Sequence, residues 1–250
     1  MESRVALITG AAKGVGAAVC RKLASQGCSI VINYGKSAAE AEALKSELSA
    51  STQASCFQAD VSDPGQVGRL FDFCGTEFGR LDVLVNNASY SSAAGWNSKA
   101  GDIDWDEWDR TIRVDLKGTM LCSHAAFKMM EPQRSGKIIN FSSSAAIWGD
   151  VPTYLYTAAK FAIVGITRTL SRAFAPHVQV NCVAPGSIAT EWIKKWKLNP
   201  AEIQAIADEA PLKRIGTPEE VAELVAFLAS PQCTFITGQT LAIDGGILLL

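Results

Sequence analysis

Short apolar, β-branched segments alternate with longer segments of helical periodicity along the whole chain. The apolar segments predict seven strands, at residues 4–10, 29–34, 55–60, 81–88, 136–144, 178–186 and 239–246. The helical segments between them span residues 15–27, 38–50, 64–79, 105–130, 153–175 and 217–230. The strands are apolar on both faces, which is typical of parallel strands covered by helices. We therefore predict an α/β class and a single-domain Rossmann fold over residues 1–250, with a doubly wound seven-stranded parallel sheet.

Composition and charge narrow the possible functions. The formal net charge of −2 provides no general attraction to nucleic acid or to an anionic membrane. The apolar run nearest the start, Val5–Ile8, is too short for a signal peptide, and no stretch approaches the ~20 apolar residues of a membrane span. Seven scattered cysteines and only two histidines do not suggest a metal site, and they favour reduced thiols. We expect a cytoplasmic protein with no metal and no nucleic-acid or membrane partner.

A glycine-rich turn, "TGAAKGVG", follows the first predicted strand and opens the first helix. Gly10, Gly14 and Gly16 permit a tight turn and a close approach of the backbone to a ligand. A helix N-terminus at this point offers free N–H groups and the positive end of its dipole to a pyrophosphate. In this position the turn predicts a dinucleotide site.

The end of the second strand bears on the choice of dinucleotide. An NAD site usually places a carboxylate there to bind the ribose, but the first acid in this sequence is Glu40, inside the next helix. Lys13 lies in the glycine turn itself. The residues that we expect near the adenosine ribose are Asn33, Tyr34, Lys36 and Ser37. Two lysines and a serine suit a 2′-phosphate and favour NADP(H) over NAD(H), unless the lysines are simply solvated surface charges.

Several motifs, in order, make the sequence resemble the classical short-chain dehydrogenase/reductase family over essentially its whole length. After the glycine turn they are "ADV" at 59–61, "NNAS" at 86–89, "NFSSS" at 140–144, "YTAAK" at 156–160, "NCVAPGSIAT" at 181–190 and "IDGG" at 243–246. Within the family the sequence is similar to 3-oxoacyl-(acyl-carrier-protein) reductases and to related ketone and sugar reductases. The resemblance implies a hydride transfer between nicotinamide and a carbonyl or secondary alcohol.

The resemblance also assigns further cofactor contacts. Asp60 and Val61 would flank the adenine, Asn87 would lie against a ribose, and Thr190 would hold the nicotinamide carboxamide together with the backbone around Ile188. The remaining contacts implied are Val15, Ala88, Pro185 and Gly186. Asp60 as the cap of a strand end, and Asn86–Asn87 as turn residues, are the alternatives.

Proton transfer can be assigned to "YTAAK". Four residues along a helix bring Lys160 to the same face as Tyr156, where an ammonium lowers the pKa of a phenol. Tyr156 is therefore the candidate general acid and base. By family spacing Ser143, rather than Ser142 or Ser144, would donate a hydrogen bond to the substrate oxygen. By resemblance, Lys160 would also bind the nicotinamide ribose.

One residue departs from the family pattern. The family usually has an asparagine in the helix after the fourth strand, where it supports a water that links the lysine to solvent, but "VDLKG" places Asp115 there. An aspartate is nearly isosteric but adds a charge near Lys160 and cannot donate when it is ionised. We expect Asp115 to belong to the catalytic group and to alter the pH dependence modestly.

The substrate is the least determined part of the prediction. By resemblance, residues 187–212 form a lid over it. Four tryptophans line its mouth or else pack elsewhere, namely Trp96, Trp148, Trp192 and Trp196. The apolar tail "GILLL" suggests burial against another subunit, and the resemblance implies a homotetramer, which is common in the family. An NAD-dependent sugar or polyol dehydrogenase, and a non-catalytic dinucleotide sensor of the same fold, are the alternative functions.

Overall fold

A seven-stranded parallel sheet forms the centre of the protein. The structure, a computed structural model, describes residues 4–90, 103–150, 153–191 and 198–248. The strands are β1 (Val5–Ile8), β2 (Ser29–Tyr34), β3 (Ala54–Gln58), β4 (Val83–Asn86), β5 (Gly136–Phe141), β6 (Val178–Pro185) and β7 (Thr240–Ile243). They lie in the order β3-β2-β1-β4-β5-β6-β7, and every neighbouring pair is parallel. The predicted fold class is confirmed.

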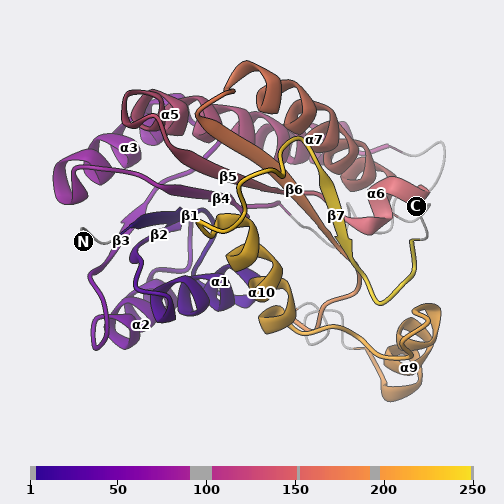
Figure 1. Cartoon of the computed structure of the whole chain (residues 1–250). Helices are drawn as coiled ribbons and strands as arrows, with labels where there is room; N and C mark the ends of the chain where they lie inside the picture. The colour runs from indigo at the N-terminus through magenta and orange to yellow at the C-terminus, as the bar shows by residue number, and fades with distance from the viewer. Residues whose placement is uncertain (1–3, 91–102, 151–152, 192–197, 249–250) are drawn as a thin grey trace.

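Helices cover both faces of this sheet (Figure 1). One layer contains α1 (Gly14–Ser25), α2 (Ala38–Leu48) and α10 (Pro218–Ala229). The other contains α3 (Pro64–Phe78), α5 (Gly118–Gln133) and α7 (Tyr154–Ala173). Two hydrophobic clusters fill the spaces between the sheet and the layers, and six of the seven free cysteines are buried. The core therefore consists of two slabs with the sheet between them.

The helix predicted over residues 105–130 is three elements in the structure. The α-helical turns of α4 (Trp105–Thr111) pass into a π-helical segment, η1 (Ile112–Lys117), before α5 begins at Gly118. A π turn inserts one extra residue per turn and is found most often at functional sites. Hydrophobic periodicity does not reveal such an insertion, so one continuous helix was predicted. The π-helical segment contains Asp115.

Two short helices were not predicted. The strand predicted to end at Ser144 ends at Phe141, and α6 (Ser144–Trp148) follows with Ser143 as its N-cap. In the expected lid region, α9 (Pro200–Glu209) begins with an Asn199–Glu202 capping box. Residues 192–197, with Trp192 and Trp196, lie outside the described part, as does Trp96.

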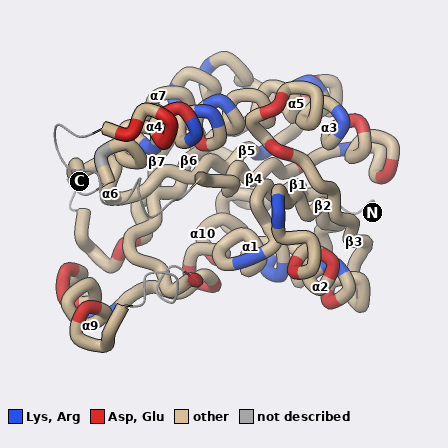
Figure 2. Tube along the Cα trace, turned by 180° about the vertical axis from the view of Figure 1, so that it is seen from behind, with Lys and Arg blue, Asp and Glu red and all other residues tan. Residues whose placement is uncertain are grey.

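Charged residues of both signs are spread over the two helical layers (Figure 2). The distribution agrees with the small net charge of the sequence. Within the described ranges, none of the helices combines the length and the apolar character that crossing a bilayer requires.

Candidate active site

The candidate residues meet at the carboxyl edge of the sheet. The glycine turn follows β1, Asn87–Tyr90 follow β4, Ser142–Ser144 follow β5, and residues 186–190 follow β6. Because parallel strands all end at the same edge, segments that are far apart in sequence converge there.

The glycine turn has the geometry of a phosphate cradle. Gly10 and Gly14 have φ angles of +60° and +54°, which disfavour any residue with a Cβ. A Cβ on Gly16 would lie 2.7 Å from Asn87 Nδ2 and 2.8 Å from the Cα of Ala11. Lys13 is the N-cap of α1, and its side chain does not cap the helix. The glycines let a ligand come close to the backbone N–H groups at the start of the helix. This arrangement suits the pyrophosphate of a dinucleotide.

Two asparagines expected beside the cofactor turn inward to hold this cradle. Asn33 is buried; its Oδ1 accepts from the Gly10 N–H at 3.3 Å, and its Nδ2 donates to the Ala59 carbonyl at 3.1 Å. Asn87 donates through Nδ2 to the carbonyls of Thr9 (2.9 Å) and Gly10 (3.0 Å). Their side chains therefore shape the site from behind.

The structure places the residues expected near the adenosine ribose at the surface, apart from Asn33. Tyr34 is half-buried at the end of β2, Lys36 is exposed, and Ser37 is the N-cap of α2 without a side-chain cap bond. Lys13 pairs with Glu40 and lies 3.8 Å from Glu191. An exposed ion pair is weak and exchanges readily, so Lys13 remains available to an incoming phosphate.

The residues expected around the adenine differ in orientation. Asp60 is exposed just after β3 and accepts from the Ser62 N–H at 2.9 Å, a local bond in keeping with the alternative of a cap at the strand end. Val61 is buried, and a Cβ on Gly118 would lie 2.8 Å from its Cγ2. Val61 therefore packs against the start of α5.

The loop after β6 bends back over the glycine turn. Gly186 packs against Asp244, since a Cβ there would lie 2.6 Å from the Asp244 Cβ. Ile188 pairs with Gly216, and the Thr190 side chain is the nearest neighbour of Gly14. Pro185 ends β6. Thr190 and Gly14 therefore approach each other, as a shared cofactor would require, whereas Ala88 backs the turn at Gly10.

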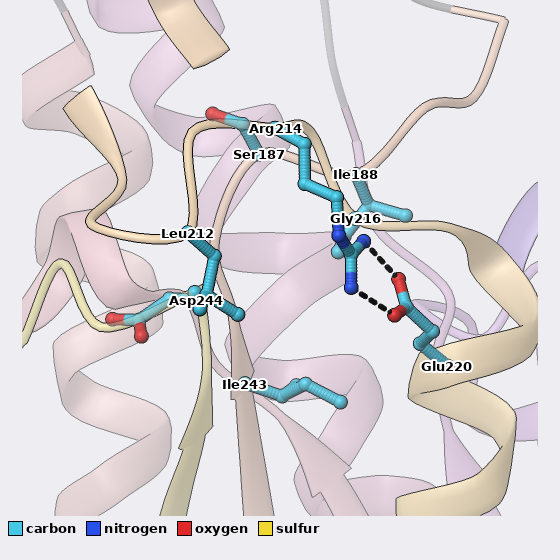
Figure 3. Close-up of a pocket in the computed structure, with 9 residues that line it drawn as sticks. Ser187, Ile188, Leu212, Arg214, Gly216, Glu220, Ile243 and Asp244 are labelled. Carbon is cyan, nitrogen blue, oxygen red and sulfur yellow. Dashed lines mark hydrogen bonds and ion pairs between the residues drawn. The ribbon is translucent and has the colours of Figure 1, made fainter. Parts of the chain in front are cut away.

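A small cavity lies behind this loop (Figure 3). Its volume is about 100 Å³, and Ser187, Ile188, Leu212, Gly216 and Asp244 are among the residues that line it. The Arg214 guanidinium closes one side through a two-pronged ion pair with Glu220, with contacts of 2.9 and 2.5 Å. At roughly 30 Å³ per water the cavity holds a few waters and is too small for a dinucleotide. Its lining includes Ser187 and Ile188, which belong to the loop after β6.

The catalytic candidates form a connected group. Lys160 is 2% exposed; its Nζ donates to the Phe141 carbonyl at 3.2 Å and lies 5.4 Å from the centre of the Tyr156 ring. Ser142 donates to the Lys160 carbonyl at 2.8 Å, so its hydroxyl is committed to the fold. Ser143 instead faces Tyr156, to which its side chain is hydrogen-bonded. Ser144 is buried like Ser142 and is the first residue of α6.

The pKa of Tyr156 moves in the opposite direction from the one expected from its lysine neighbour. Burial raises the pKa of Tyr156, and the Asp115 carboxylate raises it further, against the lowering effects of Lys160 and Ser143. Burial disfavours the Lys160 ammonium, but Asp115 and Tyr156 outweigh this effect and the pKa of Lys160 is raised. Tyr156 is therefore a phenol, and Lys160 an ammonium, at neutral pH.

Asp115 adds to the effect of burial on the pKa of Tyr156. It is completely buried, and its Oδ2 lies 3.0 Å from Lys160 Nζ. The sequence had indicated a charge near Lys160, but not the partners that hold it. Ser89 donates to Oδ2 at 2.7 Å, and the Tyr90 N–H donates to Oδ1 at 2.7 Å. Both residues lie in the loop after β4; Ser89 closes the "NNAS" motif, whereas only its position after the strand could have singled out Tyr90.

The described residues contain no group of three or more His, Cys, Asp or Glu side chains that could hold a metal ion.

Comparisons with known proteins agree with this geometry. A family profile described as "Enoyl-(Acyl carrier protein) reductase" matches residues 10–248. The chain is 37% identical to a 3-oxoacyl-[acyl-carrier-protein] reductase of Synechocystis sp., over 100% of this chain and 98% of that protein. It is 36% identical to a short-chain type dehydrogenase/reductase of Picea abies, over 97% and 92% of the two chains. The chain belongs to the short-chain dehydrogenase/reductase family. A cis-4-hydroxycyclohexanecarboxylate dehydrogenase of Sinomonas cyclohexanicum is 38% identical, over 97% and 96% of the two chains.

The packing around Gly16 predicts how the cradle responds to a single methyl group. Gly16→Ala should abolish dinucleotide binding, because its Cβ would meet backbone as well as side-chain atoms within 3.0 Å. Gly68→Ala in α3 is the matched control, since nothing lies within 4 Å of a Cβ there, and it should bind normally. Fluorescence titration with NADPH measures both. Undiminished binding by Gly16→Ala would show that the dinucleotide lies elsewhere.

Proposed function

We propose that this protein is an NADP(H)-dependent carbonyl reductase or alcohol dehydrogenase that uses Tyr156 as its general acid and base. The observation that carries the proposal is the phenol of Tyr156, held between the Ser143 hydroxyl and the buried Lys160 ammonium at the same sheet edge as the glycine cradle. Membership of the dehydrogenase/reductase family supports it.

The two halves of the reaction come from different sources. A reduced nicotinamide, when bound, would supply a hydride, that is a hydrogen with two electrons, to the carbonyl carbon. Tyr156 supplies the proton: its O–H bond breaks as the carbonyl oxygen gains the hydrogen that completes the alcohol. The phenolate left behind then recovers a proton from solvent. In oxidation the phenolate removes the proton of the alcohol and every change is reversed.

Ser143 and Lys160 act on charge. The Ser143 hydroxyl donates a hydrogen bond to the substrate oxygen as negative charge develops on it. The Lys160 ammonium stabilises the phenolate that remains after proton transfer. Because Lys160 is fixed by the Phe141 carbonyl and by Asp115, this stabilisation needs no rearrangement.

We infer that the substrate is a ketone. Two relatives point to different classes of ketone. The names of these relatives specify a 3-oxoacyl-[acyl-carrier-protein] in one case and a cyclic hydroxy acid in the other, at 37% and 38% identity. Identity therefore does not separate an acyl thioester from a cyclic ketone. We infer a substrate of one of these two kinds, with keto sugars as the third class to test.

Removal of the Tyr156 hydroxyl tests the proposal. Turnover of NADPH with a panel of 3-oxoacyl thioesters, cyclic ketones and keto sugars should identify a substrate. Tyr156→Phe should reduce kcat on that substrate by roughly a hundredfold or more, because it removes the proton donor. NADPH binding, measured by fluorescence, should survive.

Tyr154→Phe is the control, since it removes the other tyrosine hydroxyl near the start of α7. It should leave kcat within about twofold. Full turnover by Tyr156→Phe, or an equal loss in both variants, would contradict the assignment. A protein that binds NADPH but reduces no ketone in the panel would favour the alternative of a dinucleotide sensor.

We propose NADP(H) rather than NAD(H) as the cofactor. Lys36 and Ser37 stand at the end of β2 with Lys13 nearby, and the acid of this region, Glu40, is engaged by Lys13. A 2′-phosphate would find cationic and hydroxyl donors here. An NAD-dependent sugar or polyol dehydrogenase is the competing function.

The preference should appear as a difference between two titrations. NADPH should bind more tightly than NADH, and Lys36→Ala should weaken NADPH roughly tenfold while leaving NADH unchanged, as expected for a lost charged hydrogen bond. Lys45→Ala is the matched control, because Lys45 is a partly exposed lysine in the last turn of α2, where it pairs with Glu42. Tighter binding of NADH by the unmodified protein would overturn the preference.

Three further predictions concern the setting of the enzyme. They are a cytoplasmic location, a lid at about residues 187–212 and a homotetramer. Exposed aromatic side chains such as Phe161 and Phe235 support self-association.

A further inference from the structure

Three polar partners meet the carboxylate of Asp115 in the described part of the structure. Its Oδ2 accepts from Ser89 Oγ at 2.7 Å and lies 3.0 Å from Lys160 Nζ, and its Oδ1 accepts from the Tyr90 N–H at 2.7 Å. The side chain has no exposed surface. Each of these three partners directs an N–H or O–H donor at a carboxylate oxygen, and the partner of opposite charge is the Lys160 ammonium.

The loop that holds Asp115 is itself held. The Tyr90 hydroxyl donates to Glu107 Oε1 at 3.0 Å, and Glu107 is buried in α4, where Arg110 pairs with it at 3.1 Å. On the other side, η1 places Asp115 one turn before Thr119, whose hydroxyl donates to the Asp115 carbonyl at 2.6 Å. Asp115 therefore keeps its position without help from Lys160.

The pair changes what Lys160 can do for Tyr156. An isolated ammonium near a phenol stabilises the phenolate, whereas an ammonium with a carboxylate 3.0 Å away forms a pair of zero net charge. The field of this pair at Tyr156 is weaker than the field of Lys160 alone.

We propose that Asp115 is a permanent counter-ion of Lys160 that keeps Tyr156 in its phenol form, and that Ser89 and the Tyr90 N–H fix it in that role. Asp115 acts through Lys160 and is therefore a positioning residue. The functional consequence rests on the proposed role of Tyr156: reduction, which needs the phenol, should persist to higher pH, and oxidation, which needs the phenolate, should require more alkaline solution.

The other titratable groups around the pair do not replace Asp115. From β6, Cys182 faces Lys160, but burial raises the pKa of Cys182 to about 11 and keeps it a neutral thiol. From α4, Glu107 is compensated by Arg110. At the end of β5, the Phe141 carbonyl accepts a hydrogen bond from Lys160 Nζ, and just after it the Ser143 hydroxyl is hydrogen-bonded to Tyr156. The Tyr90 phenol is bonded to Glu107.

The titration of Tyr156 in the protein without cofactor tests the inference directly. Ultraviolet phenolate absorbance is followed against pH, and the curve of Tyr156→Phe is subtracted to isolate Tyr156. Asp115→Asn should move the midpoint down by about one pH unit or more, because Lys160 then acts uncompensated. If the Asn variant were unstable, Asp115→Ser removes the same charge and makes the same prediction.

Ser89→Ala is the matched control, because it removes one hydrogen bond to Asp115 but keeps the charge. Its midpoint should move by less than half of the Asp115→Asn shift. A midpoint that stays in place or rises in Asp115→Asn would overturn the counter-ion role. An equal shift in Ser89→Ala would show that packing, and not charge, sets the titration.

The pH profile of ketone reduction then links the titration to the reaction. The loss of kcat/KM at alkaline pH should move down in Asp115→Asn by the same amount as the phenolate midpoint. The two readouts fail separately: the absorbance titration needs neither substrate nor cofactor, so it judges the counter-ion even if no ketone is reduced. A shifted titration with an unshifted profile would refute the link to catalysis.

Discussion

The buried ion pair between Asp115 and Lys160 is the interaction on which the site depends. An unpaired charge in this position would cost several kcal/mol, so each partner must be satisfied from several directions. The π-helical segment η1 provides the carboxylate, and the ends of β4 and β5 provide the Ser89 hydroxyl and the Phe141 carbonyl. Helix α7 contributes both the ammonium and the phenol. Four separate segments thereby converge around the Tyr156 phenol.

The parallel sheet makes this convergence possible. Every strand ends at the same edge, so the glycine turn after β1, Ser89 and Tyr90 after β4 and the serines after β5 converge there. Much of the polar chemistry at that edge is structural. Asn33 and Asn87 bond to backbone in the glycine turn, and Ser142 bonds to α7. Their role is to place a few groups, above all Tyr156 and Ser143, at the surface of a rigid edge.

The sequence predicts the strands well because β-branched runs report local structure. In the structure Asp63 and Thr217 each accept from the backbone N–H three residues on, with a proline at the next position, so both helices begin close to their predicted starts. It predicts the site less completely. The extra residue of a π turn leaves no trace in hydrophobic periodicity, and nothing local distinguishes an inward Asn33 from an outward one. The raised pKa of Tyr156 depends first on burial and then on the Asp115 carboxylate, and neither the depth of burial nor the contacts of Asp115 with Ser89 and Tyr90, about 25 residues away, can be read from local sequence.

A double-mutant cycle on the free energy of unfolding tests the central claim most directly. Asp115→Leu and Lys160→Met each leave one buried charge without its partner, so each should cost about 3–5 kcal/mol. The double variant removes both charges and should be destabilised by less than the sum, with a coupling energy above about 2 kcal/mol. Single effects that add to within about 0.5 kcal/mol would contradict a buried ion pair as the foundation of the site.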